Sequence, residues 1–141
     1  MLTPTCVTVI VPDVTTLPNV TGECSATITT APTATDNCAG TITGTTSDPL
    51  TYNSQGTFTI EWTYDAGNGN TLTQSQTVII DDVSAPMPDE VTLNTITGEC
   101  SASITTAPTA TDNCVGMITG TTTDPLTYAT QGTFTVNWTF D

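Results

Sequence analysis

The sequence predicts an all-β protein made of two small sandwich units in tandem. The first observation is an internal repeat, since residues 12–65 match residues 88–141 without a gap at 40 of 54 positions. The second is a composition rich in Thr and poor in long side chains, which favours strands over helices. The third is a period of two in the apolar positions between turns. Together these patterns indicate about seven short antiparallel strands in a complete unit.

The first half of unit one is predicted from short runs separated by turn residues. Residues 7–11 (VTVIV) are a β-branched run that predicts a strand ending at Pro12. Residues 12–22 are rich in turn formers, and residues 25–30 alternate apolar and polar side chains as a strand does. The segment 33–40 (TATDNCAG) is expected to be a loop or a short edge strand. Residues 41–46 predict a further strand, followed by a turn on Asp48 and Pro49.

The strongest strand pattern lies in residues 57–64. Phe58, Ile60, Trp62 and Tyr64 fall on one face and polar residues on the other, as in a sheet with one buried side. Trp62 and its counterpart Trp138 could serve as sugar-stacking platforms, but their register favours core packing. Residues 66–69 (AGNG), with Asn68 at the centre, predict a reversal into a second hairpin strand over residues 70–80.

The boundaries of the repeat predict three segments: residues 1–11, a first unit at 12–82, and a second unit at 83–141. The second copy stops at Asp141, the counterpart of Asp65, so it lacks the strand corresponding to residues 70–80. Residues 8–11 (TVIV) resemble residues 77–80 (TVII), so Val7, Val9 and Val11 of one chain are candidates to complete the second unit of another by strand donation. The alternative is a cut through one continuous repeat array.

The charge balance excludes several classes of function. The chain has no Lys, Arg or His and 14 acidic residues, for a formal charge of −14. Such a surface repels nucleic acid and anionic membranes, and no run of residues is apolar enough for membrane insertion. Without His or Lys there is no ordinary general base near neutral pH and no Schiff-base lysine, so we expect no enzyme. Divalent cations are the favoured small partners.

Five cysteines predict disulfides and an oxidising, secreted location. Cys24 with Cys38, and Cys100 with Cys114, are the pairs that the repeat suggests. If Ala31 and Pro32 reverse the chain, Cys24 and Cys38 face each other within bonding distance; if the strand spans the whole sandwich, they lie at opposite ends. Cys6 lies outside the repeat and is expected to be free or paired with another chain.

These motifs resemble the hyalin repeat family of immunoglobulin-like extracellular modules. The matching segments are GECSATIT, PTATDNCAG, QGTFTIEWTYD and AGNGNT. They cover essentially all of the first copy and about three quarters of the second. The resemblance implies two immunoglobulin-like β-sandwich domains, the second lacking its last strand. It also implies a non-enzymatic spacer or adhesive module, as in large secreted adhesins and surface filaments of gliding bacteria. Many family members carry further cysteines in the later strands, where this chain has Thr and Trp.

The immunoglobulin-like arrangement also suggests a calcium site, because the end of one domain's last strand meets the loops of the next. Its candidate ligands are oxygen-bearing side chains at the expected domain ends: Glu23, Asp81, Asp82, Asp112, Asn113 and Asp141. No sequential calcium-binding loop is present. The alternative is that these acids serve turns and solubility.

The function predicted from the sequence is that of a structural repeat in an extracellular bacterial filament or adhesin stalk, whose partners are copies of itself or adjacent repeats. The alternative is an adhesive module that binds a polysaccharide, such as a surface glycan, or a receptor through loops at one end. Exposed aromatics at a loop tip would favour it, and the only candidates are Tyr52 and Tyr128, near the Asp-Pro turns.

Overall fold

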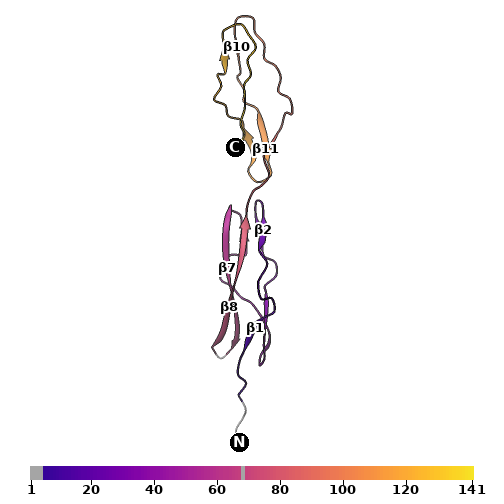
Figure 1. The fold of residues 1–141 in the computed structure, drawn as a ribbon, viewed down its shortest axis with the longest axis vertical. Helices are drawn as coiled ribbons and strands as arrows, with labels where there is room; N and C mark the ends of the chain where they lie inside the picture. Colours follow the sequence, from indigo (N-terminus) through magenta and orange to yellow (C-terminus); the bar gives the residue numbers. More distant parts are fainter. Residues whose placement is uncertain (1–4, 68) are drawn as a thin grey trace. The chain divides into compact units, whose positions relative to one another are not determined.

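The computed structural model is an all-β protein that divides into two compact units, Met1–Asp82 and Val83–Asp141. It describes residues 5–67 and 69–141, and these residues contain no helix. Asn68, at the centre of the predicted reversal, lies outside them. Figure 1 shows the long strands β7 and β8 side by side in the first unit, and only short strands such as β10 and β11 in the second.

The first unit contains eight strands within the described residues. They are β1 (Ile10–Pro12), β2 (Val20–Gly22), β3 (Ala26–Thr27), β4 (Thr33–Asp36), β5 (Gly40–Thr43), β6 (Thr51–Tyr52), β7 (Gly56–Gly67) and β8 (Asn70–Ile80). Hydrogen bonds join them in the orders β1-β4-β5, β2-β8-β7 and β3-β6. A bridge between Thr45 and Thr63 links the end of the first sheet to β7. The sequence predicts either a loop or a short edge strand at residues 33–40. In the structure, residues 33–36 of this segment are β4, the central strand of its sheet.

The β7–β8 hairpin is the framework of this unit, and both strands lie where the sequence predicts them. Their antiparallel register runs from Gly56 opposite Ile80 to Tyr64 opposite Leu72, with an irregularity between Asp65 and Gly67. The inward face of β7 is almost completely buried, because the apolar residues of β8 and of the loop before β2 cover it. The hairpin therefore holds the main hydrophobic core.

That core consists of two clusters of buried side chains. The larger contains Leu17, Ala26, Ile28, Ile60, Trp62, Val78 and Ile80, and the smaller contains Ala34, Ile42 and Tyr64. Trp62 is 2 % exposed, which fits the core role predicted from its register. The β8 strand contributes to the larger cluster through Val78 and Ile80, so the integrity of this core depends on that strand.

One strand pairing differs from the antiparallel arrangement expected throughout. Strand β2 runs parallel to β8, with Val20 opposite Val78 and Gly22 opposite Ile80. The Asp81 N–H extends the pairing by donating to the Gly22 carbonyl at 3.0 Å. A parallel partner needs a long crossover, and the β3 to β7 segment between the two strands supplies it.

The N-terminal segment belongs to the first unit, in contrast to the expected donor strand. Val11 lies opposite Thr35 in the β1–β4 pair. Pro12 is tolerated at the end of β1 because β1 is an edge strand. The Asn37 side chain accepts from the Val9 N–H and donates to the Val7 carbonyl, at 2.8 and 2.7 Å. Val7, Val9 and Val11 expose their side chains but are held by their own unit, so they are not available for donation in this structure.

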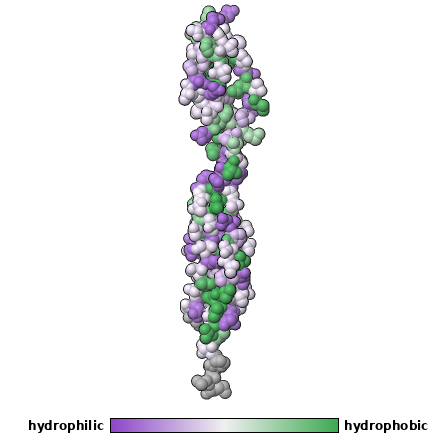
Figure 2. Space-filling model, in the orientation of Figure 1, coloured by the Kyte–Doolittle hydropathy of each residue, from purple (hydrophilic) through white to green (hydrophobic). Residues whose placement is uncertain are grey.

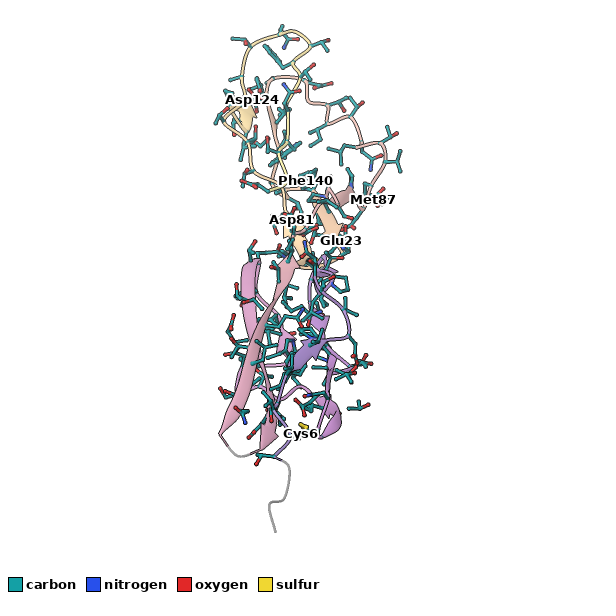
Figure 3. The ribbon with its side chains drawn as sticks, turned by 60° about the horizontal axis from the view of Figure 1, so that its bottom comes forward. Cys6, Glu23, Asp81, Met87, Asp124 and Phe140 are labelled. Carbon is teal, nitrogen blue, oxygen red and sulfur yellow. A yellow bond between two sulfur atoms is a disulfide. The ribbon has the colours of Figure 1, made fainter. Side chains whose placement is uncertain are left out.

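The disulfides also differ from the predicted pairs. Cys6 is bonded to Cys38 with a Cα–Cα distance of 5.9 Å (Figure 3). Antiparallel pairing of β1 with β4 brings these residues together, because Ile10 lies opposite Asp36. Cys24 and Cys114 are also disulfide-bonded, and Cys100 is free and exposed. The pairs Cys24–Cys38 and Cys100–Cys114 are therefore wrong, since β3 pairs with β6 rather than folding back on β4.

The second unit repeats only part of this architecture. Its described strands are β9 (Met87–Pro88), β10 (Ala102–Ser103), β11 (Thr109–Asp112), β12 (Gly116–Thr119) and β13 (Thr127–Tyr128). They form the orders β12-β11-β9 and β10-β13. Residues 132–141, the counterpart of most of β7, form no strand although their sequence predicts one. What they retain is an isolated bridge between Thr121 and Thr139.

Candidate functional site: an open groove in the second unit

The second unit contains a groove where the first unit has a packed core. Its volume is about 910 Å³, and its walls include Leu93, Ile96, Ile104, Phe134 and Trp138. Leu93, Ile96 and Phe134 expose 46 %, 50 % and 47 % of their surface. Figure 2 shows hydrophobic side chains (green) on the surface of the molecule, including this unit. Exposed apolar side chains that line one groove indicate a place where another element packs.

The first unit shows what fills the equivalent space. Leu17, the counterpart of Leu93, is 9 % exposed, and Ile28, the counterpart of Ile104, is 8 % exposed. Both belong to the larger core cluster, which Val78 and Ile80 of β8 complete. No strand occupies the place of β8 among the residues described in the second unit. The groove is therefore the space that β8 fills in the first unit.

The outer edge of this groove is already in position. In the first unit the Asp48 carboxylate accepts from the Glu61 N–H at 2.8 Å. In the second unit Asp124 accepts from the Asn137 N–H at 2.7 Å, and Thr121 and Thr139 exchange two backbone hydrogen bonds at 2.8 Å. Asp124 and Phe140 are labelled in Figure 3. Residues 132–141 are thus fixed on one side, while the side that pairs with β8 in the first unit has no strand partner among the described residues.

The groove also contains polar groups that have partners in the first unit. The Trp62 indole N–H donates to Gln76 Oε1 at 3.0 Å, and the Tyr64 hydroxyl donates to Gln74 Oε1 at 2.7 Å. Burial raises the pKa of the Tyr64 hydroxyl, which keeps it a donor. The second unit keeps the indole as Trp138 and replaces the phenol with Phe140. A strand like β8 in this groove would therefore give the Trp138 N–H an acceptor. It would find no hydroxyl at position 140, because Phe140 stands where the first unit has Tyr64.

The far end of the groove has a preformed polar clamp. In the first unit Gln55 donates to the Glu23 carbonyl at 2.7 Å, and its Oε1 accepts from the Asp82 N–H at 2.8 Å. Gln131 makes the equivalent bond to the Glu99 carbonyl at 2.6 Å. Gln131 therefore repeats the bond that Gln55 makes to the carbonyl of Glu23.

Aromatic side chains near the Asp-Pro turns are not free binding platforms. Tyr52 stacks on Phe58 with ring centroids 4.7 Å apart, and Tyr128 stacks on Phe134 at 4.5 Å. Both tyrosines are half-buried. Their rings cover part of the core or groove, so the feature that would favour a loop-tip glycan site is weak.

The six expected calcium ligands are divided between the two units. In the first, Glu23 and Asp81 border a shallow pocket of about 320 Å³ with Thr21, Gly22 and Ile79. Asp82 follows Asp81, and its N–H is bonded to Gln55. Calcium takes six to eight oxygens from carboxylates, carbonyls and water, and these side chains would supply only part of such a set.

In the second unit, the Asp112 carboxylate has a structural role, since it accepts from the N–H groups of Cys114 and Val115 at 2.8 Å. Asn113 lies in the same turn and Asp141 is exposed. The alternative that these acids serve turns therefore holds for Asp112, and calcium binding stays a prediction.

One pair of carboxylates was not singled out by the sequence. Asp13 accepts hydrogen bonds from the hydroxyls of Thr33 and Thr35 at 2.5 and 2.7 Å. Asp89 makes the same two bonds with Thr109 and Thr111. These bonds hold the pKa of each carboxyl below its ordinary value. The two threonines of each T-A-T segment lie on the same face of a strand, so both can donate to one carboxylate on a neighbouring strand. The sequence does not identify that carboxylate, because the pairing of β1 with β4 is not visible in it.

Comparisons with family models, with curated proteins and with solved structures yielded no match. Within the described residues, no helix is both long enough and apolar enough to pass through a bilayer.

Proposed function

We propose that the chain is a structural repeat module of an extracellular fibre or adhesin stalk. The observation that carries this proposal is that its two copies reproduce the same strand registers. Thr33 opposite Thr43 and Asp36 opposite Gly40 become Thr109 opposite Thr119 and Asp112 opposite Gly116. The β3–β6 and β1–β4 pairs recur in the same way as β10–β13 and β9–β11. Tandem copies of one fold are typical of proteins that act by spacing and linking.

The immunoglobulin-like character of each unit is part of the proposal. Its support is the long β7–β8 hairpin, the short antiparallel strands packed against it and the core between them, together with the motifs that resemble hyalin repeats. The buried Trp62 in the centre of that core fits the same architecture. A bacterial surface location rests on the resemblance. An oxidising setting has the further support of the disulfide-bonded cysteines.

The proposed mechanism is mechanical and colloidal. The Cys6–Cys38 disulfide spans 32 positions, so tension applied to the unit passes through the sulfur atoms and bypasses the segment between them. The formal charge of −14, with no cationic side chain, makes parallel copies repel each other and discourages lateral clumping. Absence of Lys and His removes the usual proton-transfer groups, which supports a role without catalysis.

Single-molecule stretching of the full chain tests the mechanism. The test uses the chain in which Cys24 and Cys114 are replaced by Ser, because these residues are also disulfide-bonded and would add to the effect of reduction. Under oxidising conditions the first unit of this chain should unfold with a contour-length gain about 110 Å shorter than after reduction, because the Cys6–Cys38 disulfide withholds 32 positions from extension. Replacing Cys6 and Cys38 by Ser as well should give the longer gain under either condition. Unfolding without a resolvable force peak would contradict a load-bearing role.

Immunogold labelling of intact cells that produce the protein tests the location. Antibodies raised against the chain should label filaments or stalks outside the cell, and labelling should not require permeabilisation. Labelling confined to permeabilised cells would contradict the proposal.

A further inference from the structure

We infer that the outer face of the β9–β11–β12 sheet in the second unit is a docking surface for a polypeptide segment that carries a large apolar side chain and a Lys or Arg two residues apart. Such a partner goes beyond the proposed function, which does not involve this face. Met87 of β9 and Met117 of β12 lie in one row with Thr111 of β11, because Thr111 is opposite both methionines. Side chains at paired positions point to the same face of a sheet, and all three of these residues are exposed.

The two methionines leave most of their apolar surface in water. Met87 (Figure 3) and Met117 expose 74 % and 73 % of their surface, and Val115, directly before β12, exposes 74 %. A methionine side chain is flexible and polarisable, so it adapts to the shape of an apolar side chain placed on it. Large apolar side chains that lie exposed together on one face are typical of a binding surface.

The first unit shows that the rest of the repeat does not cover this face. Its equivalent row consists of Val11, Thr35 and Thr41, paired in the same way. These three residues are exposed, although the first unit has its β8 strand and is followed by another unit in the chain. A continuation of the second unit on the pattern of the first would therefore leave the methionine row open.

The apolar character of the face is specific to the second unit. Met117 stands where the first unit has Thr41, and Val115 stands where it has Ala39. Both replacements add apolar surface at exposed positions, where packing in the unit's own core gives no reason for it. The first unit forms the same strand pair with the smaller residues, so the fold does not require the larger ones.

A carboxylate lies beside the row. Asp89 follows Met87 by two positions, and its N–H continues the strand pairing by donating to the Thr109 carbonyl at 3.0 Å. Its side chain accepts from the hydroxyls of Thr109 and Thr111, the latter at 2.7 Å, and is thereby held on the outer face. These bonds hold the pKa of the carboxyl below its ordinary value, so it stays ionised. The chain has no Lys, Arg or His to neutralise this charge.

The row and the carboxylate together specify the partner. The methionines fit an apolar side chain, and the carboxylate fits a Lys or Arg. Two positions of an extended chain, about 6.6 to 6.8 Å, separate Met87 from Asp89, so an extended partner meets both with residues two positions apart. A second copy of this chain does not fit, because it has a formal charge of −14 and no cationic side chain.

Methyl NMR of the full 141-residue chain, labelled at methionine, tests the surface. The probe is a synthetic peptide, Leu-Thr-Lys-Thr-Leu-Thr-Lys, titrated at about 150 mM salt so that long-range attraction is screened. The methyl signals of Met87 and Met117 should shift saturably with one peptide per chain. Peptides with Ser in place of Leu, or Ser in place of Lys, should bind at least about threefold more weakly. Equal binding of the Ser-for-Leu peptide, or no methyl shift with the first peptide, would overturn the docking surface.

Variants that exchange residues between the two units provide matched controls. Val115→Ala with Met117→Thr gives the second unit the residues of the first, and it should weaken peptide binding at least about fivefold, since it removes apolar contact area without disturbing the strand pair. The reciprocal change, Ala39→Val with Thr41→Met, should create a second site beside Asp13 and raise the stoichiometry to two peptides per chain. Unchanged affinity in the first variant would contradict the assignment of this face.

Asp89→Asn tests the charged half of the surface. It should weaken binding about two- to fivefold, the factor of an exposed ion pair, and it should have no effect on the peptide with Ser in place of Lys. An equal effect on both peptides would rule out the ion pair. Shifts of the Met87 and Met117 signals when the chain alone is concentrated would overturn a cationic partner in favour of a second copy. Each of these failures leaves the stretching and labelling results untouched, so it is distinguishable from failure of the proposed function.

Discussion

The two units have nearly the same sequence over residues 12–65 and 88–141, but their cores differ. In the first, Ile60 and Tyr64 are fully buried in strand β7. In the second, their counterparts Val136 and Phe140 are half-buried and lie outside any strand. The local sequences are close, since Thr57–Thr59 is identical to Thr133–Thr135 and both copies keep an apolar residue at the two compared positions. We therefore attribute the difference to β8, which pairs with β7 in the first unit and has no counterpart among the described residues of the second. A strand pattern therefore gives a strand here only where a neighbour completes the ladder and the core.

The parts that do not depend on β8 are the same in both units. Ala34 and Ala110 are both fully buried. Asp13 and Asp89 each accept hydrogen bonds from the two threonine hydroxyls at matching positions of the repeat. The comparison thus separates each unit into a β1–β4–β5 type sheet that is present with or without a β8 strand, and a β7-type segment that is a strand only beside β8.

The largest expected effect comes from disrupting β8 in the first unit. Val78→Asp places a carboxylate in a site with no exposure, so the free energy of unfolding should fall by more than about 4 kcal/mol. Hydrogen exchange should then show residues 57–64 as unprotected as residues 133–140, with the second unit unchanged. Thr73→Asp, on the exposed face of the same strand, is the control. Persistent protection of residues 57–64 in the Val78 variant would break the comparison.

The disulfide should have the next largest effect. Replacing both Cys6 and Cys38 by Ser removes a cross-link with a sequence separation of 32, which loop-closure entropy values at about 3 to 4 kcal/mol. Chemical denaturation followed by hydrogen exchange should assign this loss to the first unit. Cys100→Ser removes a free thiol and should leave stability unchanged. A comparable loss from Cys100→Ser would show that the cysteine assignment is incorrect.

The sequence predicted local elements better than it predicted their partners. Residues 57–64 and 70–80 carry long alternating patterns, and they lie in β7 and β8. Strand β4 contains a single buried apolar residue, Ala34, so its period of two was too short to detect. The disulfide depends on the β1–β4 pairing, and its partner cysteine lies outside the repeat. Neither is a local property of the chain.

The candidate site was predictable in outline and not in detail. Absence of a counterpart to residues 70–80 indicated an exposed core in the second unit. The sequence did not show that Val7–Val11 is already used by its own unit, because residues 8–11 (TVIV) match residues 77–80 (TVII) in order and so resemble a last strand. By the repeat, Val11 corresponds to Met87 of β9, so this segment is a first strand and not a last one.

The matched tryptophans sharpen the comparison further. Trp62→Phe should cost about 2 kcal/mol, because it removes ring volume from a packed core and leaves the buried Gln76 Oε1 without its donor. Trp138→Phe should cost less than about 0.5 kcal/mol, since Trp138 lines an open groove. Urea denaturation of each variant, followed by the hydrogen exchange of its own unit, gives both numbers. Equal costs would mean that the groove is closed in solution.

The smallest expected effect lies in the shared part of the units. Asp13 and Asp89 should titrate at lower pH than an Asp in an unfolded chain, because two Thr hydroxyls donate to each carboxylate. Since the folded pKa is lowered, the stabilisation is present above the unfolded pKa and is lost as pH falls through the folded pKa.

Carboxyl ¹³C titration by NMR should show both shifts. Thr33→Val should raise the pKa of Asp13 alone, and Thr109→Val should raise that of Asp89 alone, since these hydroxyls are the leading causes. Similar responses in the two units would place this corner outside the influence of β8. A shift at Asp13 with none at Asp89 would extend the difference between the units to the sheet that we describe as independent of that strand.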